Sequence, residues 1–210
     1  NHLQRSGDFL DLHMIKCKAT WLLRHGKRDR VRRQAWLEEL KAHRLMVSNP
    51  YPEDTEFTLY HFNLNGLIHS LIGDAEKDFH FRKAYLDTYR AHPEYIKRWP
   101  QNYIVALGNV AGACPNRQDF QQLLACTAEM RAFRDQHNIK NATTLDALVE
   151  TRSWGFELDA YPVLDLEARK RLHGEIQAVY KRHGKGIAEI WRLVLEFGMG
   201  RYELYHGNPE

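Results

Sequence analysis

The sequence predicts an all-α fold, a solenoid of antiparallel helix pairs. Three observations support this prediction. Apolar residues recur at intervals of three and four along most of the 210 residues, which places them on one face of a helix. Turns containing glycine or proline recur at a period of about 40–50 residues, as in helical repeat proteins. No stretch alternates apolar and polar residues for long enough to indicate a strand.

The first helix pair is expected over residues 8–45. Asp8 is predicted to cap the first helix, and Gly26 to end it. The second helix is expected near residues 29–44. The residues predicted to face inward are Phe9, Leu12, Ile15, Ala19, Leu22 and Leu23 in the first helix and Val31, Ala35, Trp36, Leu40 and Leu45 in the second.

The second helix pair is expected over residues 54–92. Two prolines and an asparagine in the preceding SNPYPED segment interrupt the helical pattern. Asp54 or Thr55 is predicted to cap the first helix of this pair. Gly73 is predicted to form the turn, and Asp74 to cap the second helix.

The third helix pair is expected over residues 102–137, and two glycines interrupt its first apolar stripe. Gly108 and Gly112 each cost about 1 kcal/mol relative to alanine inside a helix. We therefore expect another helix to approach closely at this point. Pro115 and Asn116 are predicted to form the turn, with Asn116 as the cap of the second helix.

A fourth pair is expected over residues 143–183, followed by a final helix over residues 186–205. The fourth pair is predicted to begin near Thr143, and Asp165 to cap its second helix. All pairs together predict a single helical-repeat domain over residues 1–210, as a fragment of a longer protein.

Composition restricts the class of protein further. The formal net charge is only +3, which is small for a nucleic-acid-binding domain. The three cysteines, Cys17, Cys114 and Cys126, are far apart and form no CxxC pair, so neither a zinc knuckle nor a redox dithiol is predicted, and a reducing cytosol fits best. No apolar run reaches the length of about 20 residues needed to cross a bilayer, and no membrane partner is predicted.

Two short motifs carry a family resemblance. The pattern I-x-x-L-G-x-x-A occupies residues 104–111, and N-G-x-x-H occupies residues 65–69. Both resemble the first helix of a tetratricopeptide repeat, and the resemblance extends over about Asp8 to Phe133. The distance from the turn at Gly26 to that at Gly73 exceeds the family's period of about 34 residues. The chain therefore resembles a tetratricopeptide-like (TPR-like) protein with longer than usual helices.

The resemblance implies a right-handed α-α superhelix that binds a protein or peptide in a concave groove lined by the first helix of each pair. It implies a scaffold with no catalysis and no cofactor. Basic and amide side chains in the groove would favour an acidic partner. A segment that serves only as a spacer is the alternative. The candidate groove residues are His13, Lys16, Thr20, Arg24, Asn63, Asn102 and Asn109.

A dense basic run offers an alternative function, the binding of nucleic acid or another polyanion. The run follows Arg24 and lies at the start of a predicted helix, where the helix dipole disfavours positive charge. An acidic ligand would offset that effect, and a solvated turn is the simpler interpretation. The residues of this run are Lys27, Arg28, Arg30, Arg32 and Arg33.

Catalytic and metal motifs are not apparent. None of the twelve histidines lies in an HExxH or HxH pattern. His61 and His69 share a helix but lie two turns apart, too far to hold one ion without a third element. Asp146 and Glu150 belong to a scattered set of carboxylates with no spacing that indicates acid–base catalysis. The sequence predicts no metal, no cofactor and no enzyme.

Overall fold

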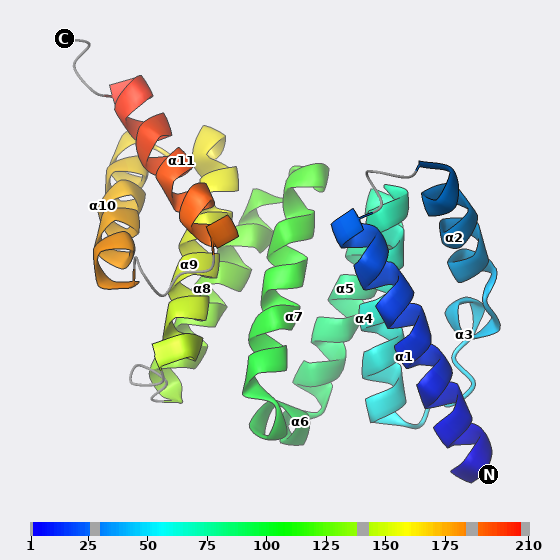
Figure 1. Cartoon of the computed structure of the whole chain (residues 1–210). Coiled ribbons are helices and arrows are strands. Elements are labelled where there is room, and N and C mark those ends of the chain that lie inside the picture. The colour runs from blue at the N-terminus through cyan, green and yellow to red at the C-terminus, as the bar shows by residue number, and fades with distance from the viewer. Residues whose placement is uncertain (1, 26–29, 138–142, 184–188, 207–210) are drawn as a thin grey trace. The chain divides into compact units, whose positions relative to one another are not determined.

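The computed structural model describes residues 2–25, 30–137, 143–183 and 189–206 (Figure 1). Every regular element within these ranges is a helix, and they contain no strand, so the all-α prediction is confirmed. The superhelical TPR-like arrangement stays a prediction. The chain divides into two compact units, Asn1–Arg98 and Trp99–Glu210, and each is described by itself. The single repeat domain over residues 1–210 also stays a prediction.

The first unit is built around two long helices, α1 and α4, which pack against each other. α4 and α5 form an antiparallel hairpin and make the most extensive contact between helices in this unit (Figure 1). The elements are α1 (His2–His25), α2 (Arg30–Ala42), α3 (Arg44–Val47), α4 (Thr55–Ile72), α5 (Ala75–Ala91) and α6 (Pro93–Arg98).

Local sequence signals set the ends of α4 and α5, as predicted. Asp54 accepts a hydrogen bond from the backbone N–H of Phe57 (3.0 Å) and caps α4. Gly73 adopts a left-handed conformation with φ of 86° and ends that helix. Asp74 then accepts from the N–H of Lys77 (3.1 Å) and caps α5. These bonds satisfy backbone donors that a helix leaves without partners at its start.

The predicted cap at Asp8 is wrong. α1 begins at His2, so Asp8 lies within the helix, where it is buried. Its carboxylate pairs with Arg44 and accepts a hydrogen bond from the hydroxyl of Tyr51 (2.8 Å). Both partners come from more than thirty residues away in sequence, so no local pattern could have identified this role.

The core of the first unit follows the predicted stripe of α1 at Leu12, Ile15, Ala19 and Leu22. Leu23 was also expected to face inward, but it is exposed. Adjacent residues in a helix point about 100° apart, and the face of α1 that packs in the core is the one that carries Leu22. Val31 and Ala35 in α2 are exposed for the same reason, since that helix buries its opposite face. The buried residues of α2 are Leu37 and Leu40.

In the second unit, α8 packs between α7 and α9, and α10 packs on both α9 and α11. None of the helices among the described residues is long and apolar enough to cross a bilayer. The elements are α7 (Pro100–Ala113), η1 (Cys114–Arg117), α8 (Phe120–Gln136), α9 (Thr143–Glu157), η3 (Leu158–Val163), α10 (Leu166–His183) and α11 (Glu189–His206).

The turn between α7 and α8 differs from the prediction. Asn116 does not cap α8, because residues 114–117 continue as a 3-10 turn. Gln118 then takes a left-handed conformation with φ of 57°. The cap is Asp119, which accepts from the N–H of Gln122 (3.1 Å). At α10, the predicted cap Asp165 is confirmed by its bond from the N–H of Ala168 (2.7 Å).

The close approach predicted at the α7 glycines is confirmed. A Cβ atom on Gly108 would lie 3.1 Å from Cε of Met130 in α8 and 3.3 Å from Cε2 of Phe156 in α9. A Cβ atom on Gly112 would lie 3.2 Å from Cε1 of Phe156. Glycine therefore lets two neighbouring helices reach the backbone of α7.

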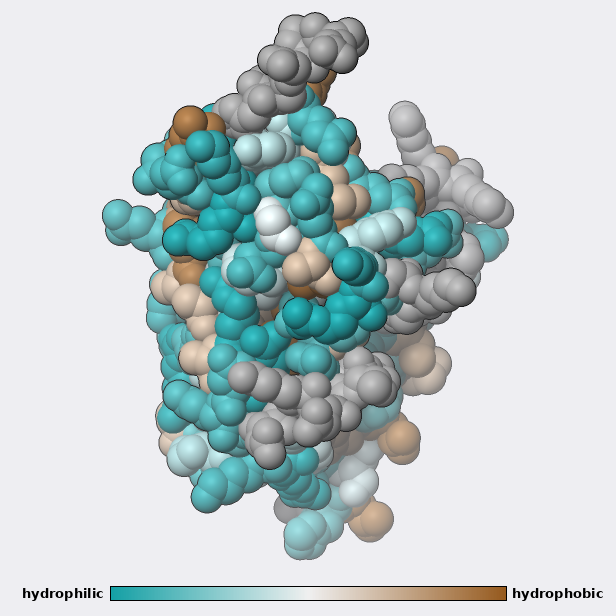
Figure 2. Space-filling model, turned by 90° about the vertical axis from the view of Figure 1, so that its left-hand side faces the viewer, coloured by the Kyte–Doolittle hydropathy of each residue, from teal (hydrophilic) through white to brown (hydrophobic). Residues whose placement is uncertain are grey.

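A separate apolar cluster holds η3, α10 and α11 together. The buried face of α10 contributes Leu172, Ile176 and Val179, and α11 contributes Leu195. Figure 2 shows that hydrophilic side chains cover most of the surface on the side of the second unit that carries α10, with separate apolar patches. α10 is thus amphipathic, with one face in the core.

Candidate functional site

One tyrosine brings two of the predicted groove residues together. The ring of His13 on α1 stacks on the ring of Tyr60 on α4, with centroids 4.9 Å apart and planes 14° apart. The ammonium nitrogen of Lys16 lies 5.1 Å from the centroid of the same ring, close enough for a cation–π interaction. The structure therefore forms a basic site, which consists of His13, Lys16 and Tyr60.

The basic site has charge and hydrogen-bonding capacity available for a ligand. Lys16 is exposed and has no carboxylate partner among the described residues, whereas Lys18 pairs with Glu39 at 2.5 Å. The Nδ1 of His13 donates to the carbonyl of Phe9 (3.0 Å), which leaves its Nε2 for another group. Burial raises the pKa of the Tyr60 hydroxyl, so the ring stays neutral and can face a cation.

The other predicted groove residues lie elsewhere. Thr20 is half-buried on α1 and Asn63 is half-buried on α4. The side chain of Arg24 lies outside the described part of the chain. Asn102 and Asn109 are on α7, in the second unit. A groove shared by all seven residues stays a prediction.

A second apolar stripe runs along α1, on the side away from the core. It consists of Leu3, Gly7, Leu10, Met14 and Cys17, and we call it the α1 stripe. Leu3, Leu10 and Met14 are 85%, 69% and 63% exposed, and both Gly7 and Cys17 are exposed. Intervals of four and three are those of a helix that packs along another helix.

The sequence analysis missed the α1 stripe because it began the helix at Asp8 and considered only the apolar residues that face the core, whereas the helix begins at His2. The available signal was the presence of two apolar stripes on one helix. Only one of them can face the core of the unit. Exposed apolar side chains in a continuous row mark an interaction surface more often than scattered ones do.

The alternative anion site is only partly described. Lys27 and Arg28 fall outside the described residues, as does the side chain of Arg30. Arg32 is exposed. Arg33 donates from Nη2 to the carbonyl of Leu71 (2.9 Å) in the last turn of α4, where a positive charge is favoured. Arg33 thus has a structural partner, and polyanion binding by the run stays a prediction.

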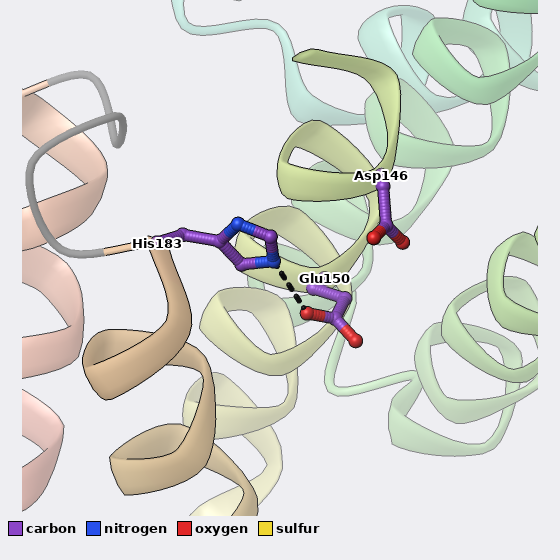
Figure 3. A group of neighbouring side chains, drawn as sticks. All are labelled: Asp146, Glu150 and His183. Carbon is purple, nitrogen blue, oxygen red and sulfur yellow. Dashed lines mark hydrogen bonds and ion pairs between the residues drawn. The ribbon is translucent and has the colours of Figure 1, made fainter. Parts of the chain in front are cut away.

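A polar cluster, which we call the Glu150 cluster, joins helices of the second unit. Figure 3 shows three of its side chains, Asp146 and Glu150 on α9 and His183 on α10. Glu150 on α9 accepts hydrogen bonds from Nε2 of His183 on α10 (2.9 Å) and from Nη1 of Arg134 on α8 (2.6 Å). Arg182 also donates to it (2.6 Å). Asp146 lies one turn before Glu150 on the same helix, 3.5 Å from Arg134.

The interpretation of these carboxylates as scattered is therefore wrong for two of them. Asp146 and Glu150 share a face of α9, as their spacing of four allows. Ligand atoms of Asp146, Glu150 and His183 all lie within 4.8 Å of one another. His183 joins them only because α10 packs on α9, a contact that no local pattern could predict.

The neighbouring arginines determine whether this cluster can bind a metal ion. Carboxylate and imidazole groups suit a divalent cation such as zinc, but two guanidinium groups already neutralise the two carboxylates. The side chain of Arg134 is only 14% exposed, so it has little room to move aside. Burial acts to lower its pKa, but the hydrogen bond and charge of Asp135 and the charge of Glu150 raise the pKa above its usual value. The residues present fit an ion-pair network and do not fit a metal centre.

His61 and His69, considered above as metal ligands, are core residues of α4. Nε2 of His61 lies 3.2 Å from the amide nitrogen of Asn65. The ring of His69 stacks on that of Phe81 at 5.4 Å. Burial lowers the pKa of both histidines, so both are neutral near pH 7.

None of the protein-family models, curated proteins or solved structures with which the chain was compared matches it. The resemblance to tetratricopeptide repeats therefore depends on the motifs of residues 65–69 and 104–111 alone. Function has to be argued from the surfaces and clusters of the chain itself.

Proposed function

We propose that the chain is a non-catalytic, TPR-like interaction module that binds an acidic amphipathic helix of a partner protein on α1. The observation that carries this proposal is that α1 presents both the exposed stripe and the exposed side chains of His13 and Lys16. His13 occupies the side of α1 between the stripe and Tyr60. A partner helix could pack its apolar face on the stripe and place carboxylates near His13 and Lys16.

The shape of the α1 stripe favours a helix as the partner. From Leu3 to Cys17 the stripe spans about 20 Å along α1, or about four turns. Its intervals of four and three match those of helices that pack lengthwise with interlocking side chains. An extended peptide, with its side-chain period of two, would not keep this register.

The charge beside the stripe favours an acidic partner over a polyanion. Lys16 lacks a counter-ion among the described residues, so a carboxylate gains a charge-assisted contact without breaking another. Nucleic acid would gain little from the apolar side chains of the stripe, and the formal net charge of the chain is only +3. Binding of nucleic acid by the run from Lys27 to Arg33 is the less favoured function.

We place this module in the cytoplasm, without a cofactor. The cysteines are free thiols, with Cys114 and Cys126 buried, which suits a reducing compartment. Burial raises the pKa of Cys114 to about 12. This thiol is therefore protonated and unreactive at neutral pH, and it serves as an apolar core residue.

The test uses a synthetic amphipathic helix with leucines in heptad register and glutamates flanking them. Fluorescence anisotropy should detect its binding to the whole chain, and the same peptide with lysines in place of glutamates should bind more weakly. Lys16→Glu and Leu10→Glu should each weaken binding about tenfold or more, a change that corresponds to about 1.4 kcal/mol.

The matched control is Lys181→Glu, which changes the charge equally at an exposed position of α10. It should bind the acidic peptide as the unchanged chain does. Equal affinities for Lys16→Glu, Leu10→Glu and Lys181→Glu would show that α1 is not the binding surface.

A further inference from the structure

We propose that the helix bound by α1 is α11 of a second copy of this chain, so that copies associate head to tail. This inference rests on the proposed function, since it names the partner of the same surface. Four features support it, and the first three are independent of the basic site on α1.

The first feature is a matching stripe. Leu193, Phe197, Gly200 and Leu204 follow one another at intervals of four, three and four along α11, and we call them the α11 stripe. The three large residues are 51%, 71% and 81% exposed, while Leu195 on the opposite side is buried in the core. α11 is thus held in the fold by one face and presents a second apolar face, as α1 does.

The second feature is a hollow beside the α11 stripe. A pocket of about 310 Å³ is lined by Leu193, Val194, Phe197 and Gly198 of α11. Gly155, Leu158 and Asp159 complete it from α9 and η3. Protruding side chains that fill such pockets carry much of the energy of an interface, and Leu10 and Met14 on α1 are exposed side chains of suitable size and chemistry.

The third feature is an exposed glycine in each stripe. A Cβ atom on Gly7 or on Gly200 would meet no other atom within 4 Å, so the fold itself does not require glycine at either position. Each glycine nevertheless weakens its helix. On a face that packs against another helix, the missing side chain makes room for a large residue of the partner, such as Phe197 opposite Gly7.

The fourth feature is charge. Glu189, Glu196 and Glu203 recur every seven residues along one flank of the α11 stripe, and Glu189 and Glu203 are exposed. Two α11 helices packed antiparallel would place these rows of glutamate against each other, which is unfavourable. Packing of α11 on α1 in the orientation that puts the glutamates on the His13 side of the α1 stripe would place them near His13 and Lys16 instead.

A contact between α1 and α11 joins two different surfaces, so two copies joined by one such contact leave one α1 and one α11 free. Such a contact continues into a ring or an open chain. Sedimentation velocity of the whole chain should therefore show a mass that increases with concentration beyond that of a dimer. This increase is the first expected result.

Variants that each block one surface give the decisive test. Leu10→Glu should block α1 and Phe197→Glu should block α11, so each variant alone should be a monomer. A mixture of the two should form a complex of two chains and nothing larger, because one intact α1 meets one intact α11. Leu3→Glu and Leu204→Glu repeat the test at the two most exposed positions of the stripes, and circular dichroism checks that each variant keeps its helices.

Three results would overturn the inference: a chain that stays monomeric at every concentration, a single variant that still dimerises with itself, or a mixture that forms no complex. The first result, together with binding of the acidic synthetic helix that depends on Lys16, would leave the proposed function intact and remove only this partner. Loss of both self-association and peptide binding would remove both proposals.

Discussion

α1 and α4 pack against each other in the first unit, yet they use their apolar residues differently. α4 contributes Phe57, Leu64 and Ile68 to the core, and α5 approaches its backbone so closely that a Cβ atom on Gly66 would lie 3.2 Å from Cγ of Arg82. α1 buries one stripe and leaves Leu10 and its neighbours exposed on another face. Apolar periodicity therefore identifies a helix without saying which stripe serves folding and which is available for binding.

The largest expected change in the free energy of unfolding tests this contrast directly. Phe57→Ala removes a fully buried ring from the core of the first unit, and we expect it to lower the free energy of unfolding by about 3–5 kcal/mol. Leu10→Ala removes an exposed side chain, and we expect it to change the free energy of unfolding by no more than about 0.5 kcal/mol. Chemical denaturation followed by circular dichroism measures both, and similar losses would mean that the α1 stripe is part of the core.

The same contrast explains what the sequence could predict. The caps at Asp54, Asp74 and Asp165 were predictable, because each bonds to a backbone N–H three residues later. The close approach of another helix at the glycines of α7 was also predictable. Glycine weakens the interior of a helix, so its presence there indicates close packing. Local signals thus located most of the helices and the close contact at α7.

The predictions that failed depend on partners distant in sequence. Asp8 resembled a cap, but Arg44 and Tyr51 hold it inside α1. The Glu150 cluster requires His183, which lies 33 residues away. On α1, His13 and Lys16 could be predicted as exposed polar positions, whereas the exposed stripe could not, because periodicity does not distinguish the two apolar faces of the helix.

The next prediction extends the comparison to buried polar groups. Glu150→Ala would remove the closest carboxylate of the buried guanidinium of Arg134, which keeps Asp135 and Asp146 nearby, and we expect a loss of about 2–3 kcal/mol in the free energy of unfolding. Lys83→Ala removes one partner of the exposed pair with Asp87 on α5, and we expect a loss of at most about 1 kcal/mol. Thermal denaturation compares the two, and a small effect of Glu150→Ala would show that water solvates the cluster.

A smaller loss of stability is expected at α7. Like α4, this helix is packed closely on more than one side. Gly108→Leu would force a side chain into the contact with Met130 and Phe156, and we expect a cost of about 1–3 kcal/mol. Gly7→Leu on the α1 stripe meets no atom within 4 Å and replaces glycine by a better helix former. It should leave stability unchanged or raise it, and an equal loss in both variants would contradict the packing described for α7.

The smallest expected change in stability concerns the buried face of α1 and should appear only at acidic pH. The hydrogen bond from Arg44, followed by that from Tyr51, lowers the pKa of Asp8 below its usual value of about 3.8. A carboxyl whose pKa is lower in the folded than in the unfolded chain stabilises the fold above the unfolded pKa, and this stability is lost as the pH falls through the folded pKa. Between about pH 4 and pH 2, Asp8→Asn should therefore lose less stability than the unchanged chain, because it has no proton to bind there.

Asp11→Asn is the matched control, since Asp11 is exposed on the same helix and lies 3.6 Å from the same arginine. If denaturation midpoints measured at successive pH values fall in parallel for both variants, the buried pair of Asp8 with Arg44 does not set the acid stability of α1.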